Sequence, residues 1–166
     1  MMFQVNDQVV HATCGVGRIV GLVTRSFAPG ESRLYYEVSG QRGTAWVPAD
    51  DGPAAGLRAL AGVSDLVHFR GVLSGRPANL HADFRQRQLD VRRRLKSATL
   101  QDVCEVVRDL AGRGWLKPLN EADANLLRVT TAALCDEWAA AAGITAGQAA
   151  AEVSALLNQG RQTYQS

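Results

Sequence analysis

The spacing of apolar residues changes once along this chain, and that change is what most limits the folds open to it. Up to residue 50, apolar residues alternate with glycine or polar residues in short runs, as in residues 15–22 (GVGRIVGL) and 32–38 (SRLYYEV). This pattern, rich in aromatic and β-branched residues, is typical of strands. After the turn sequence at residues 50–53 (DDGP), the spacing becomes helical. The change predicts an α+β protein.

The two patterns predict two domains, residues 1–55 and residues 56–166. Four to five short strands joined by Gly-rich turns predict a small β-barrel or strongly twisted sheet in the first domain. Helices joined by loops of roughly four to ten residues predict a compact all-α bundle in the second. Capping residues and apolar stripes place helices at residues 83–95, from Thr99 to residues 112–114 (GRG), after Asn120, and from Thr145 to about residue 158.

Gly15 and Gly17 flank one valine, a spacing that also occurs in nucleotide-binding loops. A nucleotide loop would be followed by a helix, but the residues after Gly17 continue the strand pattern. We therefore interpret the two glycines as positions in a curved strand where another backbone approaches closely.

Composition excludes several classes of protein. Apolar residues make up 46% of the chain and charged residues 20%, which is ordinary globular usage. No apolar run approaches the roughly 20 residues of a membrane span. The first ten residues (MMFQVNDQVV) lack the features of a signal peptide. With three cysteines at spacings that fit no disulfide or zinc framework, a reducing cytoplasm is the expected compartment.

The sequence shows no group of residues typical of catalysis. Its three histidines, His11, His68 and His81, are scattered and have no carboxylate or cysteine at metal-ligand spacing. The acidic pair Asp50-Asp51 stands beside Gly-Pro and is better explained as a turn. We therefore expect no enzyme activity, no cofactor, no metal and no small-molecule substrate.

Charge is distributed unevenly along the chain, although the net charge is only +2. Residues 1–69 hold five basic and six acidic side chains, residues 70–118 eleven and five, and residues 119–166 two and five. The basic middle part culminates in residues 79–97 (NLHADFRQRQLDVRRRLKS). A basic segment of this kind favours an anionic partner, most commonly nucleic acid.

The three successive arginines Arg92, Arg93 and Arg94 cover nearly a full helical turn, with Asp90 nearby. Such runs are often only a solvated helix face, but like charges at this density repel one another unless a partner neutralises them. Phosphate fits the forked guanidinium group well. No helix-turn-helix signature accompanies the run, so base-specific reading of the major groove is not expected.

Nearly the whole sequence resembles the CarD/CdnL family of bacterial transcription regulators, which bind RNA polymerase. Residues 3–22 (FQVNDQVVHATCGVGRIVGL), followed by YYEV, AWVPAD and GLR, are similar to the family's Tudor-like polymerase-interacting domain, shared with transcription-repair coupling factor. Residues 95–113 (LKSATLQDVCEVVRDLAGR) and 119–145 resemble its C-terminal helical domain. The order and spacing of these segments carry the resemblance.

The resemblance implies that the first domain binds the lobe of the polymerase β subunit by pairing with a sheet edge. The family's polymerase-contacting positions match Arg25, with Phe27 beside it, and Trp46, where relatives carry arginine. Trp46 has two interpretations from sequence: a flat interface anchor, or a residue of the domain core.

The resemblance also implies that the helical domain contacts promoter DNA at the upstream edge of the transcription bubble. Phe84 stands where the family usually has a tryptophan that wedges into the minor groove. Arg85 and Arg87 are then expected to face flanking phosphates or the groove. Arg92, Arg93 and Arg94 are expected to add salt-sensitive phosphate contacts.

The function expected is that of a cytoplasmic, nucleoid-associated regulator that binds RNA polymerase and promoter DNA and stabilises the open complex. Two alternatives remain open from sequence. One is a stand-alone nucleic-acid-binding protein without a polymerase partner, and the other is an adaptor whose arginines meet an acidic protein surface.

Overall fold

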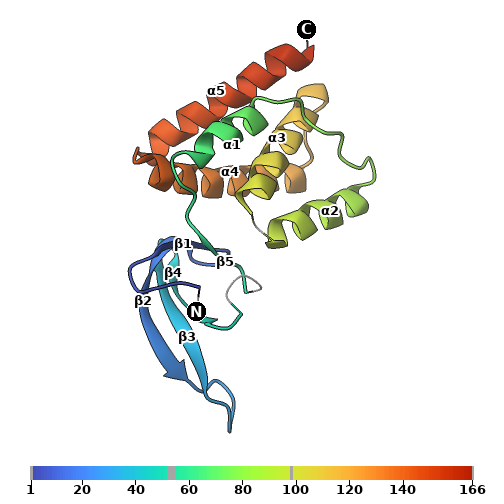
Figure 1. Ribbon diagram of the computed structural model, residues 1–166. Coiled ribbons are helices and arrows are strands. Elements are labelled where there is room, and N and C mark those ends of the chain that lie inside the picture. The colour runs from blue at the N-terminus through green and yellow to red at the C-terminus, as the bar shows by residue number, and fades with distance from the viewer. Residues whose placement is uncertain (1, 52–54, 98, 166) are drawn as a thin grey trace. The chain divides into compact units, whose positions relative to one another are not determined.

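The computed structural model describes residues 2–51, 55–97 and 99–165, so Gly52 and Pro53 of the predicted turn lie outside the described residues. The chain divides into two compact units, Met1–Leu60 and Ala61–Ser166. Figure 1 shows strands in the first unit and helices in the second. The α+β class predicted from the change in periodicity is confirmed.

The first unit is an antiparallel sheet with the strand order β4-β3-β2-β1-β5. The short strand β5 pairs with β1 and lies after the predicted change to helical spacing at residue 56. Three residues are too few to show a period, which is why the sequence pattern did not reveal this strand. The strands are β1 (Gln8–His11), β2 (Gly15–Arg25), β3 (Arg33–Gly40), β4 (Gly43–Pro48) and β5 (Leu57–Ala59).

The backbone of β2 passes very close to that of β3 at Gly17, which pairs with Gly40. A Cβ atom on Gly17 would lie 2.2 Å from the carbonyl oxygen of Ser39. A Cβ atom on Gly40 would lie 2.3 Å from the carbonyl oxygen of Cys14. The close backbone approach predicted for Gly17 is therefore confirmed.

The two faces of the sheet differ in burial, as the alternation of β3 shows. Tyr36 and Val38 are buried in the core, and the Tyr36 hydroxyl accepts a hydrogen bond of 3.1 Å from the Phe3 N–H. Tyr35 and Glu37 lie on the opposite face, which faces away from this core. The buried core of the sheet unit consists of Phe3, Val9, Cys14, Ile19, Tyr36, Val38, Val47 and Leu57.

The second unit is a bundle of helices. Its main core surrounds Trp138, whose side chain is fully buried and whose indole N–H donates to Glu152 at 3.2 Å. A smaller apolar cluster of Val91, Val106 and Leu110 packs α2 against α3. The helices are α1 (Asp65–Leu73), α2 (Phe84–Ser97), α3 (Leu100–Leu116), α4 (Glu121–Ala142) and α5 (Ala146–Gln165). Among the described residues, no helix has both the length and the apolar character needed to cross a membrane.

The predicted helix starts agree with the structure better than the predicted ends. The side chains of Thr99 and Asn120 accept hydrogen bonds from the backbone three residues later, which confirms both as N-caps. The prediction that α3 stops at residues 112–114 (GRG) is wrong, because this helix continues to Leu116. Gly112 serves close packing instead, since a Cβ atom there would lie 2.5 Å from Pro77. Helix α5 likewise runs past residue 158 to its end at residue 165.

Candidate functional site

Arg87 lies on the inner side of α2. Its side chain is buried, and its Nε and Nη2 atoms lie 3.0 and 2.9 Å from Oδ2 of Asp123 in α4. Its Nη1 atom donates to the carbonyl oxygens of His81 and Ala82. The expectation that Arg87 faces flanking phosphates or the groove is therefore wrong, because its side chain is buried and a carboxylate already neutralises its guanidinium.

Arg94 also faces the bundle. Its Nη2 atom lies 3.5 Å from Glu105 and 3.4 Å from the buried carboxylate of Asp109, both in α3. Asp109 in turn accepts from Nε of Arg108 at 2.9 Å. Arg94 and Arg87 therefore connect α2 to α3 and α4 by ionic contacts, in addition to the small apolar cluster.

The remaining basic residues of α2 face solvent. The Arg93 side chain is 78% exposed and makes a single, long contact of 3.5 Å with Asp90. Arg85, Arg92 and Lys96 are exposed, and none of them forms an ion pair with another residue in the described part of the chain. This outward side of α2 presents a concentration of positive charge that can attract phosphate groups.

Phe84 is the first residue of α2 and is 45% exposed. The Asp83 carboxylate accepts from the Gln86 N–H at 3.0 Å, which caps the helix at this point. The guanidinium of Arg87 lies 5.7 Å from the centre of the Phe84 ring. One side of the ring is thus supported by a fixed cation, and enough of it is exposed to contact a partner.

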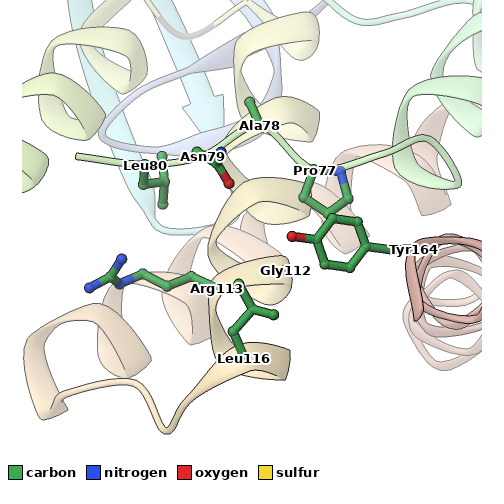
Figure 2. A pocket seen from close by; sticks show the side chains of 8 residues that line it. All are labelled: Pro77, Ala78, Asn79, Leu80, Gly112, Arg113, Leu116 and Tyr164. Carbon is green, nitrogen blue, oxygen red and sulfur yellow. The ribbon is translucent and has the colours of Figure 1, made fainter. Parts of the chain in front are cut away.

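The loop that leads into α2 is held on α3 by two contacts. The Ala78 N–H donates to Asp109 at 2.9 Å, and Pro77 packs on Gly112 where no side chain intervenes. Figure 2 shows Pro77, Ala78 and Gly112 beside a cavity. The volume of this cavity is about 140 Å³. The contacts fix where α2 begins, and hence where Phe84 lies. The cavity is lined by Pro77, Ala78, Asn79, Leu80, Gly112, Arg113, Leu116 and Tyr164.

A second candidate surface lies on the face of the sheet opposite its core. The Arg25 guanidinium lies 4.6 Å from the ring centre of Trp46 and 5.7 Å from that of Phe27. Phe27 contacts Tyr35 edge to face, with the ring centres 5.1 Å apart. The three residues matched to polymerase contacts thus come together, although they lie on different segments of the chain. Trp46 is 37% exposed and outside the core cluster, which favours the anchor interpretation.

Sequence reasoning missed Tyr35, which belongs to this aromatic group. The signal was present, because in a strand the adjacent tyrosines Tyr35 and Tyr36 must lie on opposite faces. Near this group, Arg33 forms an exposed ion pair of 3.0 Å with Asp50. The hydrogen bond from Arg33 to this carboxylate raises the pKa of the arginine.

The strand that carries Trp46, β4, lies at one edge of the sheet. An edge strand has backbone N–H and C=O groups on one side that no neighbouring strand uses. Such an edge can accept a strand from another protein, while adjacent side chains provide specificity. Trp46 lies on this edge strand, and the Arg25 guanidinium lies over its ring.

The three cysteines and His11 are buried, whereas His68 and His81 are exposed. Burial raises the pKa of the thiols of Cys14 and Cys135, which lowers their reactivity at neutral pH. Burial lowers the pKa of His11, whose Nδ1 atom accepts from the Thr13 N–H at 3.2 Å and so carries no proton in this arrangement. Among the residues that the structure describes, no three metal-ligating side chains come together.

Comparison with known proteins agrees with this two-part organisation. Residues 3–58 match the family model described as the CarD-like/TRCF RID domain, which is Tudor-like, and residues 69–154 match the model described as CarD, C-terminal domain. The chain is also similar to YdeB of Bacillus subtilis (strain 168), which carries the name of a transcription factor. The two are 26% identical over 149 residues, which cover 89% of this chain and 97% of YdeB.

Proposed function

Because the chain belongs to the CarD family, we propose that it regulates transcription by binding the RNA polymerase β subunit and upstream promoter DNA together, thereby stabilising the open complex. The observation that carries this proposal is the outward basic side of α2, which begins next to the half-exposed ring of Phe84. Two contacts joined in one chain raise each other's effective concentration, so neither needs to be tight alone.

The polymerase contact in this proposal uses the edge strand β4 and the group of Arg25, Phe27 and Trp46. Aromatic residues and arginine are the residue types that most often dominate the binding energy of an interface. The Phe27 side chain is 62% exposed, so a partner has much apolar surface to cover. Backbone pairing along β4 would provide affinity without demanding a particular partner sequence.

The DNA contact in this proposal uses Phe84 as an apolar wedge at an unstacked base step. Arg85, Arg92 and Arg93 bind phosphates and contribute affinity that does not depend on base sequence. Arg87 and Arg94 hold α2 in place from its inner side, so they support the DNA contact without touching DNA.

Charge reversal by Arg25→Glu is expected to weaken binding to the polymerase β lobe by about 30-fold, the effect of losing one interface hot spot. The carboxylate would also remove the cation that lies over Trp46. The measurement is a titration of the full chain with the isolated lobe. Arg18→Glu is the matched control, because Arg18 is an exposed arginine of the same sheet, in the part of β2 that pairs with β1. Equal binding by both variants would contradict the proposed interface.

Phe84→Ala is expected to shorten the half-life of the open complex by about fivefold or more, since stacking on a base contributes roughly 1–3 kcal/mol. Phe84→Trp is expected to match or lengthen the wild-type half-life, because indole offers a larger stacking surface. The measurement is the decay of polymerase–promoter complexes after a competitor is added. An alanine variant with the wild-type half-life would exclude the wedge and leave the polymerase contact unaffected.

A further inference from the structure

The outward side of α2 contains a leucine among its basic residues. At about 100° per residue, positions 85, 89, 92 and 96 follow one another along a single narrow stripe of a helix. All four side chains of this outer stripe are exposed, while Val91 and Leu95 face the bundle. Leu89 is 65% exposed and lies between Arg85 on one side and Arg92 and Lys96 on the other.

The spacing of these charges fits a nucleic-acid backbone. With a rise of 1.5 Å per residue, Arg85 and Arg92 lie about 10 Å apart along the helix axis, and Lys96 lies about 6 Å further on. The minor groove of DNA is about 6 Å wide and has a row of phosphates along each edge. Two arginines this far apart can reach both rows, which places the residue between them over the groove.

We propose that the outer stripe of α2 lies across the minor groove of double-stranded DNA, with Leu89 against the sugars between phosphates bound by Arg85 and Arg92. This inference rests on the proposed function and adds a contact to it. Phe84 lies five residues earlier and about 140° around the helix from Leu89, beside the inward-facing Arg87. The two side chains therefore point in different directions from α2. In this proposal, Leu89 contacts intact duplex and Phe84 contacts the open base step.

The composition of the stripe favours DNA over an acidic protein as the occupant. The centres of protein–protein interfaces are depleted of charged residues. Protein–DNA interfaces, in contrast, are much more positively charged. Three cations around one leucine, with no carboxylate in the stripe, follow the second pattern. The leucine can fill the space over the sugars that the cations, drawn to the phosphates, leave empty.

The test measures binding of the full chain to polymerase–promoter complexes over a range of salt concentrations. Leu89→Ser is expected to weaken binding about fivefold at every salt concentration, because it removes an apolar contact and no charge. The logarithm of the binding constant falls linearly with the logarithm of the salt concentration, and the steepness of this fall is the salt slope. Arg92→Ala is expected to lower the salt slope by about one, because one phosphate contact is lost. Leu89→Met, which keeps an apolar side chain, is expected to bind as the wild type does.

Leu116→Ser is the matched control, because Leu116 is also 65% exposed but lies at the end of α3. If Leu89→Ser binds as well as Leu116→Ser while Arg92→Ala lowers the slope, the Leu89 contact is overturned and the proposed function stands. A triple variant carries alanine at Arg85, Arg92 and Lys96. If its binding depends on salt as steeply as that of the wild type, both the Leu89 contact and the proposed function are overturned. If Leu89→Ser weakens binding to polymerase without DNA, the stripe faces protein and the inference is overturned.

Discussion

Asp123→Ala is expected to lower the free energy of unfolding of the helical unit by about 3–5 kcal/mol, the usual effect of removing one partner of a buried ion pair. The Asp123 carboxylate accepts from Arg87 and, at 2.6 Å, from Gln88. Without it, the buried guanidinium keeps its hydrogen bonds to carbonyl groups but has no counter-charge. The measurement is urea denaturation followed by far-UV circular dichroism, to which this helical unit contributes most.

A double variant separates loss of the pair from loss of packing. Arg87→Met combined with Asp123→Leu removes both charges and fills similar space, so it is expected to recover most of the lost stability. Arg93→Ala serves as the control, since an exposed arginine with one long contact should change stability by less than about 1 kcal/mol. If Asp123→Ala is no more destabilising than this control, the pair is not a determinant of the position of α2.

Gly17→Ala is expected to destabilise the sheet unit by about 3 kcal/mol, near the upper end for overpacking. The new methyl group would lie 2.2 Å from the Ser39 carbonyl oxygen and 2.7 Å from Cα of Gly40. Both neighbours are backbone atoms in a paired strand, so neither can move aside without breaking the sheet. The measurement is amide hydrogen exchange in β2 and β3, which reports on this unit separately from the helices.

Gly21→Ala provides the control in the same strand. A Cβ atom there would lie 3.5 Å from a Glu37 carboxylate oxygen, which is an ordinary contact. This variant is expected to exchange as slowly as the wild type and to keep binding the polymerase lobe. If the amides of β2 and β3 in Gly17→Ala exchange as slowly as those in Gly21→Ala, the two strands do not approach as closely as the structure indicates.

The sequence predicted the architecture well because each part follows one clear period. The strand pattern and the turn glycines led to the sheet, and the stripe from Leu100 to Leu110 led to α3. The predicted end of α3 at residues 112–114, which contain Gly112 and Gly114, was wrong for a physical reason. Glycine is also selected where two segments touch, and the sequence alone cannot separate that use from a helix stop.

The orientation of the arginines could be predicted only in part. Val91 and Leu95 mark the inner side of α2, and Arg87 falls on the same side by helical periodicity. Its partner Asp123 lies 36 residues later, so pairing depends on tertiary structure that a charge run does not reveal. For the sheet, by contrast, strand register brings Arg25 and Trp46 onto one face.

The burial of Arg87 and Asp123 has a consequence for how the chain would leave DNA. Dissolved ions compete strongly for exposed contacts between cations and phosphates, but they screen a buried ion pair much less. The Asp123 side chain is 1% exposed, so water and ions have almost no access to it. A rise in electrolyte is therefore expected to detach the nucleic acid while α2 stays attached to α4. If the proposed function holds, the released protein would keep its binding surface assembled and would engage another promoter without refolding.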